Sequence, residues 1–190
     1  LYGIPIGKRN KLNVTIQIQQ RWNFCAPATV SMMLASRGKI VDQFTLAREM
    51  GTYEPFGTHN RDAIRILNKH MFGYEFPQTN QAGYRIETVR EINSASIELF
   101  KQRLIKNTQD GYPMYYTFNP GKIYPGIANA EHNVAGAGYI ATPDNKDVAL
   151  VYYVDPYYKF QDPIYGGLKV VTPEELLNAM VGVSEPDYAW

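Results

Sequence analysis

Cysteine is nearly absent from this sequence, which has one such residue, Cys25, among its 190. A single cysteine excludes a disulfide within the chain, and a chain of this length can bury a core without one. Histidine is also scarce, because there are only three and they lie far apart in the sequence. One cysteine and three scattered histidines lack the spacing of zinc ligands, so a metal site is not expected.

Blocks of like charge and long apolar runs are missing as well. The 19 basic and 18 acidic residues give a formal net charge of +1 and are spread along the chain. This balance argues against a nucleic-acid partner and against an anionic membrane surface. No apolar run approaches the roughly 20 residues that a membrane-spanning helix needs. Because no internal repeat is found either, we expect one domain covering residues 1–190.

The N-terminus suggests processing, because the chain begins at Leu1 rather than at Met. A cleaved signal peptide is one explanation and a truncation made for expression is another. On the first explanation the protein is secreted or held at the cell surface, and a cytoplasmic location stays open. The sequence does not indicate an oligomeric state, and a monomer is assumed.

Periodic apolar residues predict that helices dominate the first part of the chain. Caps and glycines mark the ends of these helices, and a capping box opens the last one. The expected helices run from Cys25 to about Arg37, over 43–50 behind Asp42, over 61–72 behind Asn60, over about 96–108, and from Pro173 to about Val181.

Strands are expected mainly in the second part, where β-branched and aromatic residues alternate between turns. The expected strands are 14–18, 84–89, 112–118, 133–141, 148–154 and 169–171. Residues 142–146 read Thr-Pro-Asp-Asn-Lys, so the strands on either side of them should form an antiparallel hairpin. The expected fold is α+β, with an irregular arm over 1–16, a helical lobe over about 17–110, a sheet lobe over about 111–190, and a groove between the lobes.

Cys25 is the first candidate for a catalytic residue. It stands where a helix should begin, because Pro27 suits the first helical turn. The positive end of the helix dipole favours a thiolate, which is the nucleophilic form of cysteine. The side-chain amide of Gln19 could donate to an oxyanion, and Gln20 is the alternative because the intervening loop is irregular. Alternatively, Cys25 is a small buried apolar residue, as most free cysteines are.

His132 and Asp155 are the other candidates. His132 opens one strand of the expected hairpin, and Asp155 directly follows the other strand. In an antiparallel hairpin the start of one strand lies beside the end of the next, so the two side chains should meet. The carboxylate would then fix the imidazole's tautomer while the other ring nitrogen faces a thiol. Taken singly, each has an ordinary structural role: His132 as a hydrogen-bonded strand residue, and Asp155 as a turn residue before Pro156.

An ordered set of short motifs resembles one family. The motifs are Gln19–Leu34 with Cys-Ala-Pro-Ala, Gly111-Tyr112-Pro113, Glu131–Tyr139 with Glu-His-Asn-Val, and Val154-Asp155-Pro156-Tyr157. In this order they resemble the papain-like cysteine peptidases related to the double-glycine leader (bacteriocin-processing) peptidases, and the likeness extends from about residue 17 to 180. The chain departs from many members by having Ala26 where they have glycine. It also lacks transporter segments, so it looks like a free-standing relative.

The resemblance implies a papain-like fold and a Cys-His-Asp triad of Cys25, His132 and Asp155, with Gln19 completing the oxyanion hole. The expected reaction is hydrolysis of a peptide or isopeptide bond in a peptide or protein substrate, without a metal or organic cofactor. Transpeptidation and deamidation would use the same triad and remain alternatives. So does a binding module that keeps the fold without the chemistry.

Overall fold

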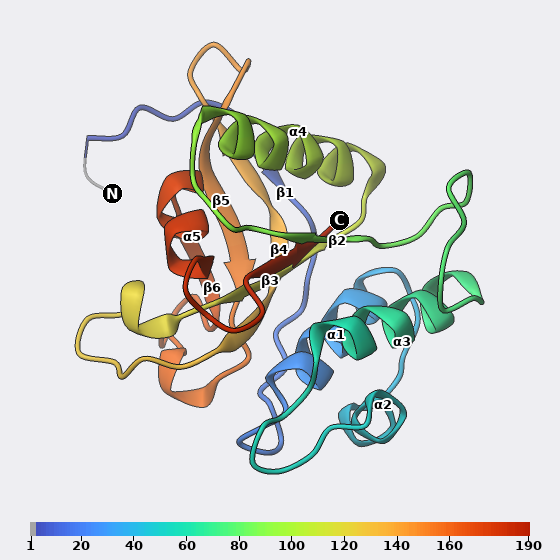
Figure 1. Ribbon diagram of the computed structural model, residues 1–190. Helices are drawn as coiled ribbons and strands as arrows, with labels where there is room; N and C mark the ends of the chain where they lie inside the picture. Colours follow the sequence, from blue (N-terminus) through green and yellow to red (C-terminus); the bar gives the residue numbers. More distant parts are fainter. Residues whose placement is uncertain (1–2) are drawn as a thin grey trace.

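The computed structural model describes residues 3–190, and an antiparallel sheet runs through its middle (Figure 1). Within these residues the strand order is β2-β7-β3-β4-β5-β6, and β1 pairs with the part of β4 that lies beyond its pairing with β3. The strands are β1 (Arg9–Lys11), β2 (Ile86–Thr88), β3 (Met114–Phe118), β4 (His132–Ala141), β5 (Val148–Val154), β6 (Leu168–Val171) and β7 (Asp187–Ala189).

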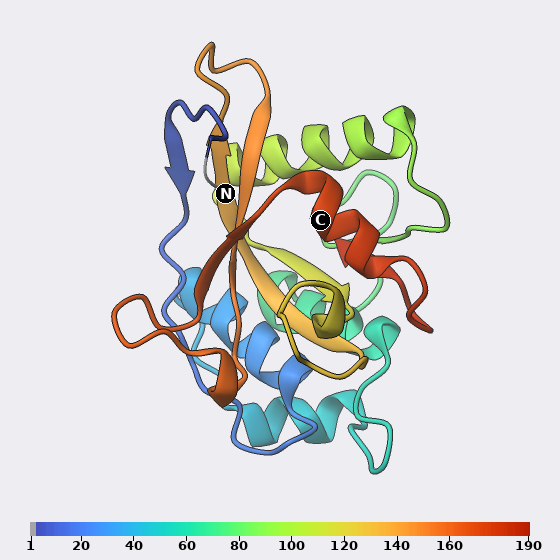
Figure 2. The same cartoon turned by 90° about the vertical axis from the view of Figure 1, so that its left-hand side faces the viewer.

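Helices cover both faces of this sheet. Figures 1 and 2 show α1–α3 grouped together, apart from α4 and α5. Each group packs against the sheet and buries its own apolar cluster there. The expected helical lobe, 17–110, includes α4, but α4 packs on the sheet beside α5, so in packing it belongs with the sheet half. The helices are α1 (Cys25–Ser36), α2 (Gln43–Met50), α3 (Asn60–Phe72), α4 (Ser94–Asp110) and α5 (Pro173–Met180).

The central strand β4 is buried along its whole length and joins the two clusters. Ala135 faces the cluster of α1–α3, whereas Val134 faces the cluster of α4 and α5. An irregularity between Gly136 and Tyr139 reverses this alternation. At Gly138, φ is +106° and an added Cβ would lie 2.1 Å from the carbonyl oxygen of Asn10. Only glycine fits there, because β1 passes so close to the bulge.

Most predicted elements are present, and the errors in the strands lie near the chain ends. The strand expected over 14–18 is wrong: this segment is irregular, and the N-terminal strand is β1. Val14 is buried and Ile16 and Ile18 are exposed, so the segment is held by packing on one side without a partner strand. The short strand β7 was not expected. The first two residues of the expected arm, 1–16, lie outside the described part of the chain.

The cap of α3 also differs from the prediction. The N-cap is His59 rather than Asn60, and its side chain makes no capping hydrogen bond. Instead the carboxylate of Glu185, a residue near the C-terminus, accepts from the Asn60 backbone N–H at 2.8 Å. A carboxylate at this place satisfies an amide that has no partner inside the helix and suits the dipole. The side chain of Asn60 is thereby left for contacts deeper in the molecule.

The predicted hairpin is confirmed. Strands β4 and β5 pair antiparallel, with Ala135 opposite Val154, and Asn145 adopts a positive φ of 60° in the turn. The Thr172 and Glu175 side chains form the expected capping box at α5. None of the helices in residues 3–190 combines the length and apolar character that crossing a bilayer would need.

Candidate active site

The thiol of Cys25 lies at the N-terminal end of α1, as expected. Residues 26–34 of this helix are all buried, whereas Cys25 is partly exposed. The core therefore anchors the helix and presents only its first residue to a cavity of about 450 Å³. As that first residue, Cys25 has a backbone N–H without an acceptor inside the helix. Its Sγ lies 3.2 Å from Oδ1 of Asn133 on β4.

His132 and Asp155 are in direct contact. Nε2 of His132 and Oδ1 of Asp155 lie 2.6 Å apart, and both side chains are buried. The contact exists because β4 begins beside the point where β5 ends. The Asp155 carboxylate also accepts from the Tyr157 backbone N–H at 2.9 Å and from the Tyr124 hydroxyl at 2.7 Å. Asp155 is therefore held in place by contacts of its own.

The buried carboxylate changes the charge state of His132. Burial lowers the pKa of this histidine, but the charge of Asp155, the hydrogen bond to it, and the contact with Cys25 together raise the pKa to about 10. The imidazole is thus positively charged at neutral pH. With Nε2 engaged by Asp155, the other ring nitrogen, Nδ1, is the one left for the thiol.

Gln19 lines the same cavity as Cys25, whereas Gln20 is exposed. Nε2 of Gln19 donates to the backbone carbonyls of Arg21 and Trp22, at 3.0 and 2.9 Å. Its Oε1 is buried and has no hydrogen-bond partner among residues 3–190. The orientation of this amide is fixed, because turning it over would place Oε1 against two carbonyl oxygens.

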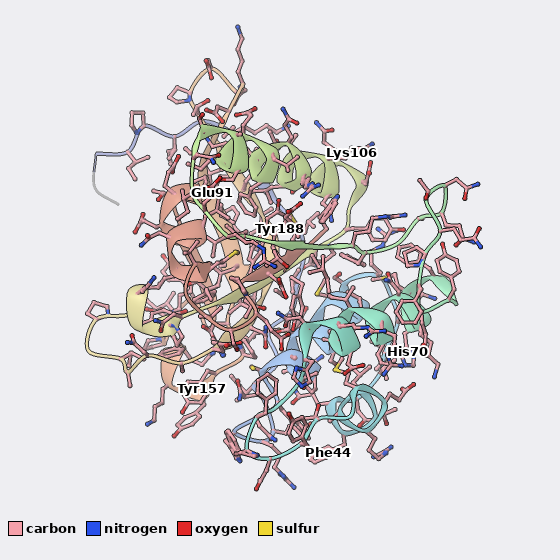
Figure 3. The ribbon with its side chains drawn as sticks, in the orientation of Figure 1. Phe44, His70, Glu91, Lys106, Tyr157 and Tyr188 are labelled. Atoms are coloured by element: carbon pink, nitrogen blue, oxygen red, sulfur yellow. The ribbon has the colours of Figure 1, made fainter. Side chains whose placement is uncertain are left out.

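Aromatic rings surround the histidine. Tyr124 stacks on Phe160 with ring centroids 4.0 Å apart, and the rings of Phe118, Tyr157 and Phe160 each lie 6.1 Å from that of His132. Tyr157, which Figure 3 labels, comes from the segment after β5 and lines the cavity. These rings limit the access of water to the His132–Asp155 pair, which strengthens its electrostatic attraction.

The sequence did not single out Tyr124 or Asn133, and it marked Asn60 only as the expected cap of α3. Asn133 directly follows His132 in the sequence, but successive side chains of a strand point to opposite faces, so the pattern did not place Asn133 beside the thiol. The contacts of Tyr124 and Asn60 depend on loop and helix packing. In residues 3–190, no cluster of three or more His, Cys, Asp or Glu side chains could hold a metal ion.

Comparison with known proteins identifies the family. A family model described as "Peptidase_C39 like family" matches residues 11–173, most of the chain. The chain belongs to this family. The expected resemblance to relatives of the double-glycine leader peptidases is therefore confirmed. No curated protein matches the sequence.

Solved structures share the fold of this C39-like chain at low identity. A double-glycine motif protease from an AMS/PCAT transporter, solved with its leader peptide, has a TM-score of 0.55 and 15% identity over 98% of this chain and 96% of its own. A protein from Bacillus anthracis described as a C39-like peptidase has a TM-score of 0.59 and 17% identity over 93% of both chains. The peptidase domain of Streptococcus ComA has a TM-score of 0.55 and 11% identity over 94% of this chain and 97% of its own.

These likenesses establish the fold. The helices of α1–α3 and the antiparallel sheet form the papain-like α+β architecture of C39 peptidases, as predicted. Family and fold together support cysteine peptidase activity.

Proposed function

We propose that this C39-like protein is a cysteine peptidase that cleaves a peptide or protein substrate through Cys25, His132 and Asp155. The observation that carries the proposal is the arrangement of one cavity. The thiol stands at the start of α1, and a histidine charged through a 2.6 Å contact with a buried carboxylate lines the same space.

In the proposed reaction the Cys25 thiolate attacks the carbonyl carbon of the scissile bond and forms a carbon–sulfur bond. His132 gives its proton to the departing amine, and a thioester remains. Water then attacks the thioester while His132 takes one of its protons, and Cys25 leaves as the thiolate, so the starting ion pair is restored. Asp155 keeps the imidazole oriented and stabilises its positive charge throughout.

The oxyanion would be held by the backbone N–H of Cys25 and by Nε2 of Gln19. The burial of Gln19 in the same cavity supports this role, and the exposure of Gln20 argues against the alternative. Nε2 already donates to two carbonyls. The role therefore requires that one of its hydrogens be shared with the oxyanion when substrate binds.

A peptide-library digest tests the proposal. The wild type should release peptides whose masses show the addition of one water at the cleaved bond, and Cys25→Ala should release none. A product joined to a second peptide would instead show transpeptidation. Gln20→Ala is the matched control, because it changes an exposed residue close to the site. If correctly folded wild-type protein cleaves nothing in the library, the binding-module alternative is favoured.

Alkylation by iodoacetamide tests the proposed thiol–imidazole pair without any substrate. Cys25 is the only cysteine, so no other thiol contributes to the rate. The rate should stay high below pH 7 in the wild type and fall sharply there in His132→Ala, because the charged imidazole stabilises the thiolate. Equal rates in the two proteins would contradict the pair.

A further inference from the structure

A series of hydrogen bonds between buried side chains connects Cys25 to β7, the C-terminal strand. From the thiol, Asn133 is the first member, since its Oδ1 lies 3.2 Å from Sγ. Nδ2 of Asn133 lies 3.4 Å from Oδ1 of Asn60, and Nδ2 of Asn60 lies 3.0 Å from Oδ2 of Asp187. The three side chains are exposed by 6%, 2% and 7%. Their orientations are therefore set by one another rather than by water.

The orientation of the amides in this series is set by the contacts that Asn60 makes with residues near the C-terminus. Nδ2 of Asn60 faces two groups that can only accept, the carboxylate of Asp187 and the backbone carbonyl of Glu185 at 3.3 Å. Oδ1 of Asn60 accepts from the Tyr115 hydroxyl at 2.9 Å. Turning this amide over would place an oxygen against a carboxylate and a carbonyl, which is unfavourable. Asn60 therefore presents its oxygen to Asn133.

Asn133 must therefore direct its side-chain nitrogen, Nδ2, toward the oxygen of Asn60. If its amide were turned over, two acceptor oxygens would face each other across 3.4 Å. Its other partner, the Thr117 hydroxyl at 2.7 Å, can donate or accept and so imposes no orientation. The contact with Asn60 decides the matter, and the oxygen of Asn133 is left pointing at Cys25.

We propose that Asn133 is a positioning residue whose side-chain oxygen accepts a hydrogen bond from the Cys25 thiol, and that Asp187, acting through Asn60, fixes this orientation. The inference rests on the proposed function in assigning the nucleophile to Cys25. An acceptor oxygen stabilises S–H and repels S⁻. The amide chain therefore opposes His132, which favours the thiolate from its own side of the sulfur.

Other ionisable groups also lie around the cavity that holds the sulfur. Tyr115 stays neutral, since burial and the nearby charges of Cys25, Glu185 and Asp187 raise its pKa. Beyond His132, the ionisable side chains that line the cavity are those of Glu131, Tyr157 and Lys159. Asp187 is linked to the sulfur by hydrogen bonds that run through Asn60 and Asn133.

The pH dependence of iodoacetamide alkylation, measured on the full chain without substrate, tests this assignment. Asn133→Ala should lower the midpoint of the alkylation profile by about half to one pH unit, the size expected for the loss of one hydrogen bond between neutral groups. Thr117→Val is the matched control. It removes a hydroxyl that can hydrogen-bond to Asn133 in either orientation of the amide. The midpoint should therefore stay within a few tenths of a pH unit of the wild-type value.

Asp187→Asn tests the far end of this series of hydrogen bonds. The new amide can present either an oxygen or a nitrogen to Asn60, so only the 3.3 Å contact with the Glu185 carbonyl still opposes turning Asn60 over. The orientation of Asn133 is then held less strongly, and the midpoint should fall. Removing the charge of Asp187 acts in the same direction, and a double-mutant cycle separates the two effects. In the Asn133→Ala background, Asp187→Asn should lower the midpoint clearly less than it does in the wild type.

Three results would overturn the inference. They are an Asn133→Ala midpoint equal to or above that of the wild type, equal Asp187→Asn shifts in the two backgrounds, and lower melting temperatures with unchanged midpoints. The last would mean that the amides only support the fold. Since no substrate is used, a failure of the proposed peptidase function is seen separately, as absent cleavage by a wild type whose variants still shift the alkylation midpoint.

Discussion

Replacing Asp155 by Asn should remove a charge from the site while the His132 ring keeps its orientation. Oδ1 of Asp155 accepts from His132 Nε2–H and from the Tyr157 backbone N–H, and Oδ2 accepts from the Tyr124 hydroxyl. A backbone N–H can only donate, so the amide oxygen of the variant should take the Oδ1 position. Its nitrogen then faces the Tyr124 hydroxyl, which can accept.

The size of the effect follows from the charge state of His132. Its pKa is about 10 against an ordinary value of 6.5, although burial acts to lower it, and the charge of Asp155 is the largest contribution in the raising direction. The difference corresponds to about 5 kcal/mol. Without that charge the pKa should fall toward its ordinary value, because burial still lowers it and the largest opposing contribution is gone. If it reaches 6.5, the charged fraction of the imidazole at about pH 7.5 falls from nearly all to about a tenth.

The assay compares turnover and iodoacetamide alkylation against pH in the wild type, Asp155→Asn and Asp155→Ala. At about pH 7.5, Asp155→Asn should lose about tenfold or more in turnover, because fewer molecules hold the ion pair. Asp155→Ala should lose more, since the ring also loses its orienting partner. A stable Asp155→Asn protein with full turnover and an unchanged alkylation profile would refute the reasoning. Asp155 would then be a turn residue that caps local amides.

Three further predictions concern the oxyanion, pH and the cap of α3. Gln19→Ala should lower kcat about 100-fold with little change in thiol alkylation, and Gln20→Ala should do little; the reverse result would assign the oxyanion to Gln20. The charge of His132 should stabilise the fold fully below about pH 6.5, and this contribution should be lost as pH rises through about 10, because its folded-state pKa is raised. Urea titrations should therefore show the wild type losing at most about 5 kcal/mol over that interval and Asp155→Asn losing much less, whereas parallel losses would contradict the assignment. Glu185→Ala should cost about 1 kcal/mol of stability, because the first turn of α3 loses its capping acceptor, and an unchanged melting temperature would show that the cap contributes nothing.

Local signals explain why much of the site was predictable. The start of α1 follows from Pro27 and the apolar spacing behind it, which act within a few residues. The hairpin follows from the turn at 142–146, and pairing within a hairpin is short-range. Once that hairpin is assumed, the contact between His132 and Asp155 is a matter of register. These three features were therefore accessible before any long-range contact was known.

The errors came from contacts that no local pattern encodes. The run over 14–18 alternates like a strand, but the free edge of β4 is reached by residues 9–11 instead. Asn60 is a residue type that favours helix caps, yet its backbone N–H at the start of α3 is bound by the carboxylate of Glu185, which lies 125 positions away. Both outcomes depend on which backbone groups remain unpaired after the sheet has formed.

By itself, the sequence determined the α+β class, the family resemblance, the cysteine at a helix start and the histidine and aspartate of one hairpin. Only the tertiary structure decided how the amides around the thiol are turned. Asn133 is 108 positions from Cys25 and Asp187 is 127 positions from Asn60, and each orientation depends on the next partner in the chain. The physical reason is that a buried amide has two ends of similar shape and opposite hydrogen-bonding character. Its direction is fixed only by the donors and acceptors that folding brings against it.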